Sequence, residues 1–256
     1  MALESLMDSE EFINVLYYGE PGTAKTSHAA SMALAGGKII VVDVEAGVRR
    51  RPLQNLGIPV DNIMVAKVRT YQELSELTAN IAATLAQDPA AITGVVIDSM
   101  TELTKRFTDN LVLARFNKRT KAGMVDDEFE VELGEHGKVT EQLRRVARNL
   151  RDLPCHTVFT ALEKQDKDKD MSIFYRPALG PKFANDLMSF VDIVVHTSVE
   201  KDAETGELVR LGTTSPIGKY RGKDRMGCLP TIMVEPTFHR ITQVVGGELT
   251  TDDVAA

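Results

Sequence analysis

The chain has 256 residues, a formal net charge of −7 and 43% hydrophobic residues. This length and composition favour one large α/β domain with a buried core. The negative net charge excludes overall positive charge as the basis for nucleic-acid binding, although a local groove or loop can still bind nucleic acid. The two cysteines, Cys155 and Cys228, lack metal-site spacing and are expected to be reduced thiols. Without a long apolar run or a signal-peptide pattern, we expect a cytoplasmic protein with no membrane contact.

The first part of the sequence alternates strand patterns with helix patterns. Glycines at 36 and 37 end the first helical segment, and a Thr-x-x-Glu capping signature at Thr70 and Glu73 begins the second. Short apolar runs predict buried strands, and apolar residues at helical spacing predict the segments between them. The predicted strands are 12–18, 38–45, 62–68 and 94–99, and the predicted helices are 25–35 and 70–87.

The second part of the sequence is more polar and richer in strand patterns. We expect a mobile acidic loop over 117–137, a helix with a basic face over 138–152, a buried strand over 155–162, a charged loop or hairpin over 164–183, strands over 192–200 and 207–215, and a frayed tail after about 240. Together the elements predict an α/β fold whose mainly parallel sheet is flanked by helices, with a β-rich C-terminal extension.

A phosphate-binding loop is indicated at residues 19–26, which read GEPGTAKT between a predicted strand and a predicted helix. The pattern G-x-x-x-x-G-K-[ST] is matched except at Ala24, which replaces the second glycine. Alanine costs little there if its φ is negative. Backbone N–H groups would surround the phosphates, and Lys25 would bridge the outer two. We therefore expect ATP and Mg²⁺, bound by Gly19, Glu20, Pro21, Gly22, Thr23, Ala24, Lys25, Thr26 and Ser27, with the Thr26 hydroxyl as a metal ligand.

Two carboxylates follow apolar runs at positions suited to the chemistry of ATP hydrolysis. Asp98 ends the run VVI, and at this position a carboxylate orders the Mg²⁺ shell, usually through water. Ser99 comes next instead of a glutamate, so a catalytic base must come from another strand. Glu45 ends the neighbouring run VVDV and is the candidate base for water activation. Asp43, two residues earlier, is expected to be a buried structural residue.

At these residues the chain resembles the RecA superfamily. VDVEAG (42–47), LGIPVDNIMVAKVRTYQEL (56–74) and GVVIDSMTEL (94–103) resemble RecA segments in the same order and at similar spacing. Within the superfamily the chain resembles the short phage proteins of the Sak type, which are RecA-like single-strand annealing ATPases of roughly this size. The resemblance implies a RecA-like P-loop NTPase core that binds single-stranded DNA in phage recombination or annealing. It also implies a ring or filament of identical subunits that hydrolyses ATP at subunit interfaces, with a single-strand-binding protein as a further partner.

The resemblance also implies roles for later residues. YRGKDRMG (220–227) carries Lys223 and Arg225, which would reach the nucleotide of a neighbouring subunit, and Thr160 would sense the γ-phosphate. The implied DNA-binding loops correspond to 117–137 and 164–183. The second contains aromatic rings among cations, a pattern that suits single strands, at Lys164, Lys167, Lys169, Phe174, Tyr175 and Arg176. The expected organisation is an N-terminal arm (1–11), a core (12–200), a β-hairpin region with the Lys-Asp-Arg finger (201–240) and a tail (241–256).

Three alternatives stay open. GEPGTAKT also resembles the MoxR branch of AAA+ proteins, which remodel other proteins. Ser99 beside Asp98 and a strand-rich last third in place of a helical lid argue against that branch. The second alternative is that the chain is a nucleotide-gated DNA-binding module with negligible turnover of ATP. The third alternative concerns the segment 164–183, which would be an ordinary charged hairpin instead of a DNA-binding loop, because its aspartates offset the charge of its lysines.

Overall fold

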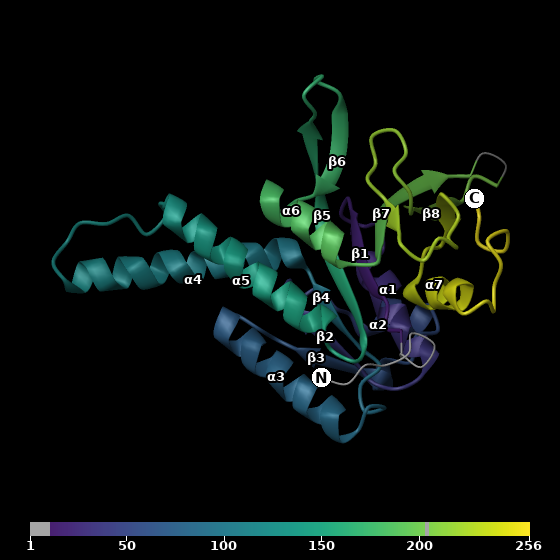
Figure 1. The fold of residues 1–256 in the computed structure, drawn as a ribbon, viewed down its shortest axis with the longest axis horizontal. Helices are drawn as coiled ribbons and strands as arrows, with labels where there is room; N and C mark the ends of the chain where they lie inside the picture. Colours follow the sequence, from purple (N-terminus) through teal and green to yellow (C-terminus); the bar gives the residue numbers. More distant parts are fainter. Residues whose placement is uncertain (1–10, 203–204) are drawn as a thin grey trace, which may run out of the picture.

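The computed structural model describes residues 11–202 and 205–256 as one α/β unit (Figure 1). Its sheet follows the order β10-β8-β7-β1-β5-β4-β2-β3, with β6 paired to β5 and β9 paired to β7. The strands from β7 to β3 are parallel, whereas β6, β8, β9 and β10 are antiparallel to their neighbours. The bounds are β1 (Asn14–Gly19), β2 (Ile39–Asp43), β3 (Ile63–Ala66), β4 (Gly94–Asp98), β5 (His156–Lys167), β6 (Ile173–Pro177), β7 (Ile193–Lys201), β8 (Leu208–Thr213), β9 (Lys223–Asp224) and β10 (Ile232–Val234).

Helices cover both faces of this sheet, as expected for parallel strands that are apolar on both sides. The helices α3, α4, α5 and α6 pack on one face, and α1, α2 and α7 pack on the other. Their bounds are α1 (Lys25–Ala30), extended by the 3-10 turn η1 (Ser31–Ala35), α2 (Arg50–Asn55), α3 (Tyr71–Gln87), α4 (Met100–Lys121), α5 (Leu133–Arg151), α6 (Pro181–Phe190) and α7 (Phe238–Val245), with a second 3-10 turn, η2 (Val60–Asn62). In the described ranges, every helix is too short or too polar to cross a lipid bilayer.

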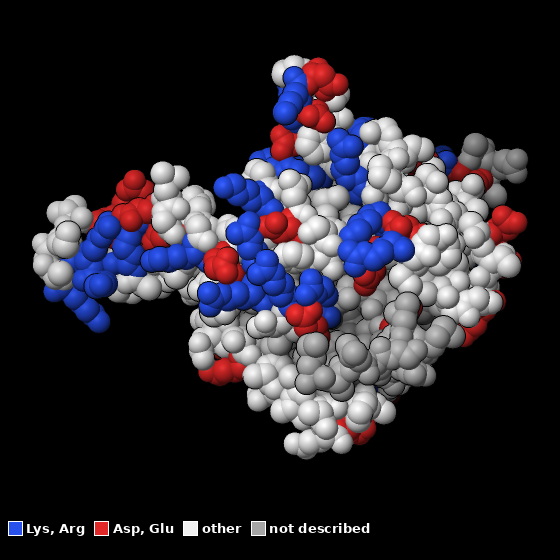
Figure 2. Space-filling view, viewed as in Figure 1, with Lys and Arg blue, Asp and Glu red and all other residues white. Residues whose placement is uncertain are grey.

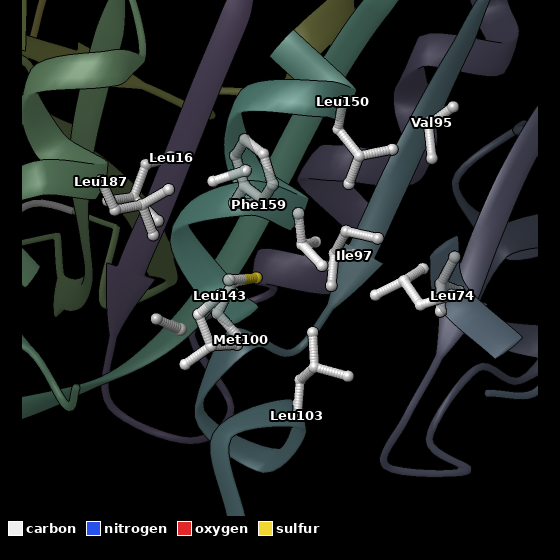
Figure 3. Packing of buried hydrophobic residues seen from close by; sticks show 14 of the residues in the cluster. Leu16, Leu74, Val95, Ile97, Met100, Leu103, Leu143, Leu150, Phe159 and Leu187 are labelled. Carbon is white, nitrogen blue, oxygen red and sulfur yellow. The ribbon is translucent and has the colours of Figure 1, made fainter. Parts of the chain in front are cut away.

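Alternating side chains along the central strands build two separate cores. In β1, Leu16 and Tyr18 join the cluster beneath α3 to α6, whereas Val15 and Tyr17 join the cluster beneath α1, α2 and α7. Successive residues of a strand point to opposite faces, so each strand contributes to both layers. Figure 3 shows the larger layer, where the β5 ring of Phe159 packs between side chains of other strands and of the covering helices.

Most predicted elements are confirmed within a few residues. The strands near residues 12, 38, 62, 94 and 155 correspond to β1, β2, β3, β4 and β5. The second predicted helix corresponds to α3, where the Thr70 side chain accepts a hydrogen bond from the N–H of Glu73 at 3.2 Å. The Glu73 carboxylate accepts from the N–H of Arg69 instead of Thr70. The predicted strands 192–200 and 207–215 form the antiparallel pair β7 and β8, and residues 203–204 of the turn between them lie outside the described residues.

The loop expected over 117–137 is confined to residues 122–132, and the expectation is wrong for the residues on either side. Helix α4 continues to Lys121 and α5 begins at Leu133, so the two helices form an arm that extends beyond the sheet (Figure 1). Arg115 explains this order, because its guanidinium bonds the carboxylates of Asp126 at 3.1 Å and Glu135 at 3.0 Å. The acidic residues read as signs of a loop are therefore ion-pair partners that close a helical hairpin.

The frayed tail expected after about residue 240 is also wrong. Helix α7 begins after Thr237, whose side chain accepts a hydrogen bond from the N–H of Arg240, and it packs its apolar side against the sheet. Beyond α7, the side chain of Val254 is buried and its carbonyl accepts from the N–H of Val234 at 2.8 Å. Ile241, Val244 and Val254 are thus part of the core. The N-terminal arm lies outside the described residues, except for Glu11.

Candidate nucleotide site

The P-loop joins β1 to α1 and is held against β7. Gly19 ends β1, and a Cβ atom there would lie 2.3 Å from the carbonyl oxygen of Thr197, so only glycine fits. The Thr23 hydroxyl lies 2.7 Å from the Thr197 hydroxyl and donates to the carbonyl of Glu20 at 2.9 Å. The loop geometry therefore depends on β7, a strand far away in the sequence.

Ala24 has a left-handed backbone, with φ 64° and ψ 20°, directly before the first helical residue. Ala24 therefore does not meet the condition, a negative φ, under which alanine costs little at this position. An L-residue in this region costs about 1–2 kcal/mol, because its Cβ approaches the following carbonyl. The second glycine of the usual pattern is absent in sequence, but the backbone adopts the conformation that favours glycine.

The Lys25 ammonium folds back over the loop that precedes it. Its Nζ donates to the carbonyl oxygens of Gly19 at 3.0 Å and Glu20 at 2.6 Å. Burial lowers the pKa of Lys25, and the carboxylates of Asp98 and Glu45 oppose this effect. The ammonium is thus a partly desolvated cation whose present partners are weak acceptors, which suits exchange for phosphate oxygens.

Asp98 lies at the end of β4, with a hydroxyl on each of its oxygens. Thr26 donates to Oδ2 at 2.6 Å and Thr160, from β5 between β1 and β4, donates to Oδ1 at 2.5 Å. Burial is the main cause of a raised Asp98 pKa, and the two hydroxyls oppose it. A threonine hydroxyl beside a carboxylate is the hard-oxygen set that Mg²⁺ prefers. Thr26 and Asp98 therefore fit the ion, and the Thr160 hydroxyl is placed to orient Asp98.

The candidate base Glu45 lies just beyond β2, next to the end of β4. Asp43 and Asp98 are paired in the parallel register, so the residues after them meet at the same edge of the sheet. The Ser99 hydroxyl donates to Oε1 of Glu45. The Asp43 carboxylate accepts from the N–H groups of Gly47 at 2.9 Å and Val48 at 3.3 Å, so it shapes the turn that carries Glu45.

A buried polar cluster lies beside the P-loop, under the β5–β6 hairpin. His196 Nε2 lies 2.7 Å from Glu163 Oε2, and the His196 ring stacks on the Tyr220 ring at 4.0 Å between centroids. The Tyr18 hydroxyl donates to the carbonyl of Arg221 at 3.0 Å and accepts from its N–H at 2.9 Å. Burial lowers the pKa of His196 although the Glu163 carboxylate raises it. Through Tyr18, which directly precedes Gly19, the cluster connects the P-loop to the loop over 217–221.

The β5–β6 hairpin carries the residues expected to contact DNA. Lys164, Lys167 and Lys169 are exposed, and Phe174 and Tyr175 are half-buried. Arg176, in contrast, is 6% exposed and donates to the Asp166 carboxylate at 2.7 Å and to the Leu179 carbonyl at 2.7 Å. Arg176 is thus buried at the base of the hairpin and hydrogen-bonded within the protein, so the prediction that it contacts DNA does not fit this structure.

The loop over 217–221 lies against this hairpin and adds two cations to it. The Arg221 guanidinium lies 4.8 Å from the Phe174 ring centroid, and the Lys219 ammonium lies 5.1 Å from the Tyr175 ring centroid. The N–H of Tyr175 donates to the Lys219 carbonyl at 2.8 Å, which fixes the loop on the hairpin. Hairpin and loop form one aromatic and basic surface.

Lys223 and Arg225 point the same way, as their i, i+2 spacing predicts, and both contact the C-terminal end of α6. Lys223 Nζ donates to the carbonyls of Met188, Ser189 and Val191 at 3.0, 3.1 and 2.6 Å. Arg225 donates to the Asp192 carboxylate at 2.6 Å. Burial lowers the pKa of Lys223. Within one subunit the pair stabilises the end of a helix.

Several residues of the site escape prediction from sequence. Ser99 was noted only as a missing glutamate, and its bond to Glu45 depends on the register of β2 and β4. Glu163 and His196 are 33 residues apart and meet because β1 pairs with both of their strands. For the loop over 217–221 a sequence signal was present. Lys219 and Arg221 form a second Lys-x-Arg pair with the same spacing as Lys223 and Arg225.

Comparisons with known proteins identify a family for the chain. No curated protein matches the chain. Among solved structures, a KaiC-like protein from the hyperthermophilic archaeon Pyrococcus horikoshii is similar over 78% of this chain and 76% of its own, with a TM-score of 0.44 and 16% identity. Residues 11–226 match the family described as AAA domain, AAA_24. The chain therefore belongs to this AAA-domain family, and its P-loop on β1 and Asp98 on β4 lie in a mainly parallel sheet flanked by helices, with β5 between the two strands.

Proposed function

We propose that the chain is an ATP-dependent single-stranded DNA-binding protein that hydrolyses ATP at interfaces between identical subunits and acts in phage recombination or annealing. The observation that carries the enzymatic part is the pairing of Glu45 with Ser99 beside Asp98. The residue after Asp98 is Ser99, which cannot act as a carboxylate base. Glu45, just beyond the neighbouring strand β2, supplies a carboxylate instead.

In this proposal Lys25, Thr26 and Asp98 hold the triphosphate and Mg²⁺. Mg²⁺ supplies charge neutralisation on the phosphate oxygens when it is bound. The Lys25 ammonium exchanges the carbonyls of Gly19 and Glu20 for phosphate oxygens, which are stronger acceptors because they are charged. Thr160 keeps Asp98 oriented through its hydroxyl. These residues bind and orient the substrate.

Glu45 is the proposed general base. Its side chain is exposed and the Ser99 hydroxyl holds one of its oxygens, which leaves the other free to accept a proton from an attacking water. A positioned carboxylate of this kind contributes about 10²–10⁴-fold to the rate. The role of Ser99 is to position Glu45.

The proposed DNA surface is the hairpin together with the loop over 217–221. Its rings, Phe174 and Tyr175, lie beside the Arg221 and Lys219 cations, an arrangement that allows bases to stack while phosphates pair. Figure 2 shows basic and acidic residues mixed at the hairpin tip and a concentration of basic residues over α5. The overall charge of −7 therefore conceals local positive surfaces.

Two Lys-x-Arg pairs compete for the role in the neighbouring nucleotide site. Lys223 and Arg225 are the pair implied by the resemblance, and they must release the α6 carbonyls to reach another subunit. Lys219 and Arg221 have the same spacing and lie next to the P-loop cluster through Tyr18. Mixing a Lys25→Ala subunit with Lys223→Ala or Lys219→Ala subunits decides between them, because only a trans-acting pair restores turnover in the mixed assembly.

A protein-remodelling AAA+ ATPase is the second candidate, favoured by the AAA-domain match. The two functions differ in what accelerates turnover and drives assembly. We expect single-stranded DNA to bind more tightly with a non-hydrolysable ATP analogue present, and the mass in solution to rise to that of a ring or filament. Assembly without any DNA affinity would contradict the proposal and favour the AAA+ candidate.

A further inference from the structure

The end of the α4–α5 arm is a projecting loop with exposed apolar side chains. Phe129 is 83% exposed, and Val125 and Leu133 are more exposed still. The arm extends beyond the sheet, so this loop lies away from the rest of the chain (Figure 1). Large apolar side chains that gather on an exposed surface mark interaction sites, because their burial is favourable.

Arg115 holds this loop in a defined shape. Its Nη2 donates to the carbonyl oxygens of Asp127 at 2.9 Å and of Glu130 at 2.7 Å, on either side of Phe129. The N–H of Phe129 donates to the Asp127 carboxylate at 2.8 Å. A partner that binds Phe129 therefore meets a preorganised loop, and little free energy is lost in ordering it.

The loop is strongly acidic around Phe129. Residues 126–132 read DDEFEVE and contain five carboxylates and no cation. Unlike the carboxylates that bind Arg115, those of Glu128 and Glu130 are exposed and make no ion pair in the part of the chain that the structure describes. Figure 2 shows acidic residues on one side of the arm and basic residues on the other. Such a loop repels the phosphates of DNA and suits a partner that offers apolar surface and cations.

The same chain carries a cavity of this kind, with a volume of about 680 Å³, lined by residues of α4, α5 and the start of α6. Val139, Leu143 and Phe183, which belong to the core, supply its apolar wall. Sites that enclose a small molecule measure roughly 300–1,000 Å³, so this cavity has room for one aromatic side chain. Phe129 of the same chain does not line it.

The polar part of the cavity wall favours an acidic guest. Lys105 and Lys182 line it, against one carboxylate, that of Asp109. Gly180, the N-cap residue of α6, also lines it and supplies no side-chain hydrogen bond to the N–H groups of the first turn. Carboxylates are stabilised near lysines and near the N-terminal end of a helix. The cavity thus matches the loop both in apolar surface and in charge.

We propose that the arm loop of one subunit docks on a second copy of this chain, with Phe129 in the cavity between α4, α5 and α6 and with Glu128 and Glu130 at its lysines. Loop and cavity are different surfaces of the chain, so the contact is heterologous, and its repetition yields a ring or a filament. This inference rests on the assembly part of the proposed function and requires neither ATP nor DNA.

The first test removes the aromatic anchor. Sedimentation velocity over a range of protein concentrations, without nucleotide or DNA, gives the mass of the wild-type protein, Phe129→Ser and Leu208→Ser. Leu208→Ser is a matched control, because Leu208 is 71% exposed on β8, outside the arm and the cavity. We expect the wild-type mass to rise with concentration, Phe129→Ser to weaken association at least about tenfold, and Leu208→Ser to change nothing. Equal melting temperatures show that the variants stay folded.

The second test reverses charges on both surfaces. One variant carries Glu128→Lys and Glu130→Lys in the loop, another carries Lys105→Glu and Lys182→Glu in the cavity, and a third carries all four changes. Each of the first two places like charges against each other, so we expect weaker association. The third restores opposite charges, so we expect association to recover toward that of the wild type.

Three outcomes overturn the inference: a wild-type protein that stays monomeric at every concentration, a wild-type mass for Phe129→Ser, or a fourfold variant that associates no better than the twofold variants. Phe129→Ser that weakens binding of single-stranded DNA at unchanged mass also overturns it and assigns the loop to DNA. A wild-type protein that assembles through Phe129 but neither hydrolyses ATP nor binds DNA contradicts the proposed function and supports this inference, so the two failures are distinguishable.

Discussion

The Ser99 hydroxyl donates a hydrogen bond to the Glu45 carboxylate and connects the residue after β4 to the residues after β2. Ser99 also begins α4, where its side chain accepts from the N–H of Glu102 at 3.3 Å. One hydroxyl therefore caps a helix and positions the proposed base. This double use explains how a serine can follow Asp98 in an ATPase site.

Replacing Ser99 with alanine should separate positioning from stability. We expect ATP turnover to fall about tenfold, as for a loss of ~1.4 kcal/mol in the transition state, with little change in ATP affinity. The lost cap should also cost about 1 kcal/mol of unfolding free energy. Thr70→Ala is the control, because it removes the cap of α3 far from Glu45. If both variants lose turnover equally, Ser99 has no positioning role.

Ala24→Gly should stabilise the protein by about 1 kcal/mol, because glycine adopts a left-handed backbone without the Cβ clash. Urea unfolding at neutral pH measures the difference. Ala29→Gly makes the same chemical change inside α1, where it should instead destabilise by about 1 kcal/mol or more. A loss of stability in both variants would mean that Ala24 is not left-handed in solution.

Asp98→Asn should raise the melting temperature of the nucleotide-free protein and abolish Mg²⁺-dependent ATP binding. Burial raises the pKa of Asp98, so the charged form is disfavoured in the folded state and a neutral side chain of the same shape relieves this. Thermal melts with and without Mg²⁺–ATP measure both effects. A lower melting temperature without ligand would show that the Thr26 and Thr160 hydrogen bonds outweigh burial.

Lys223→Ala should destabilise the isolated chain by about 2 kcal/mol, since charge-assisted hydrogen bonds to the α6 carbonyls are lost. Lys219→Ala, which removes a cation stacked on Tyr175 and Tyr220, should cost less than about 1 kcal/mol. Chemical denaturation measures both. If Lys223→Ala melts like the wild type but loses turnover, its role lies between subunits and not at the end of α6.

Stability should fall as the pH is lowered from 7.5 to 5.5, with buried histidines as the cause. The pKa of His28 is lowered to about 3 in the folded protein, so only the unfolded chain takes up a proton below its ordinary value near 6.5. The stability that His28 contributes is therefore present above pH 6.5 and lost below it, by about 1.4 kcal/mol at pH 5.5. His28→Phe should show a correspondingly smaller pH dependence in urea titrations. An identical pH dependence in both proteins would contradict the buried neutral state.

The parts of the fold that the sequence predicts well are those determined locally. Apolar runs that end in Asp43 and Asp98 identify β2 and β4, because parallel strands place such carboxylates at one edge of the sheet. The α4–α5 hairpin was missed because Arg115 pairs with carboxylates 11 and 20 residues away, which resemble loop residues in sequence. Arg176 looks like a surface cation, and only the strand pairing shows that it is buried against Asp166.

The roles of site residues depend on register and on distant contacts. Thr197 contacts the P-loop residue Thr23 from a strand 174 residues away in the sequence, and hydrophobic periodicity carries no information about such a contact. Helix α7 was missed although local signals for it are present, because Thr237 caps it and its buried residues Phe238, Ile241 and Val244 follow helical spacing.

Turnover of ATP by the wild-type protein and by Glu45→Gln, each with and without single-stranded DNA, tests the proposed function most directly. We expect DNA to accelerate wild-type hydrolysis and Glu45→Gln to reduce it at least about 10²-fold while ATP binding is retained. Wild-type turnover that is near zero, or equal in Glu45→Gln, would contradict the enzymatic assignment and leave a nucleotide-gated binding module. Acceleration by a protein client alone would contradict the DNA assignment.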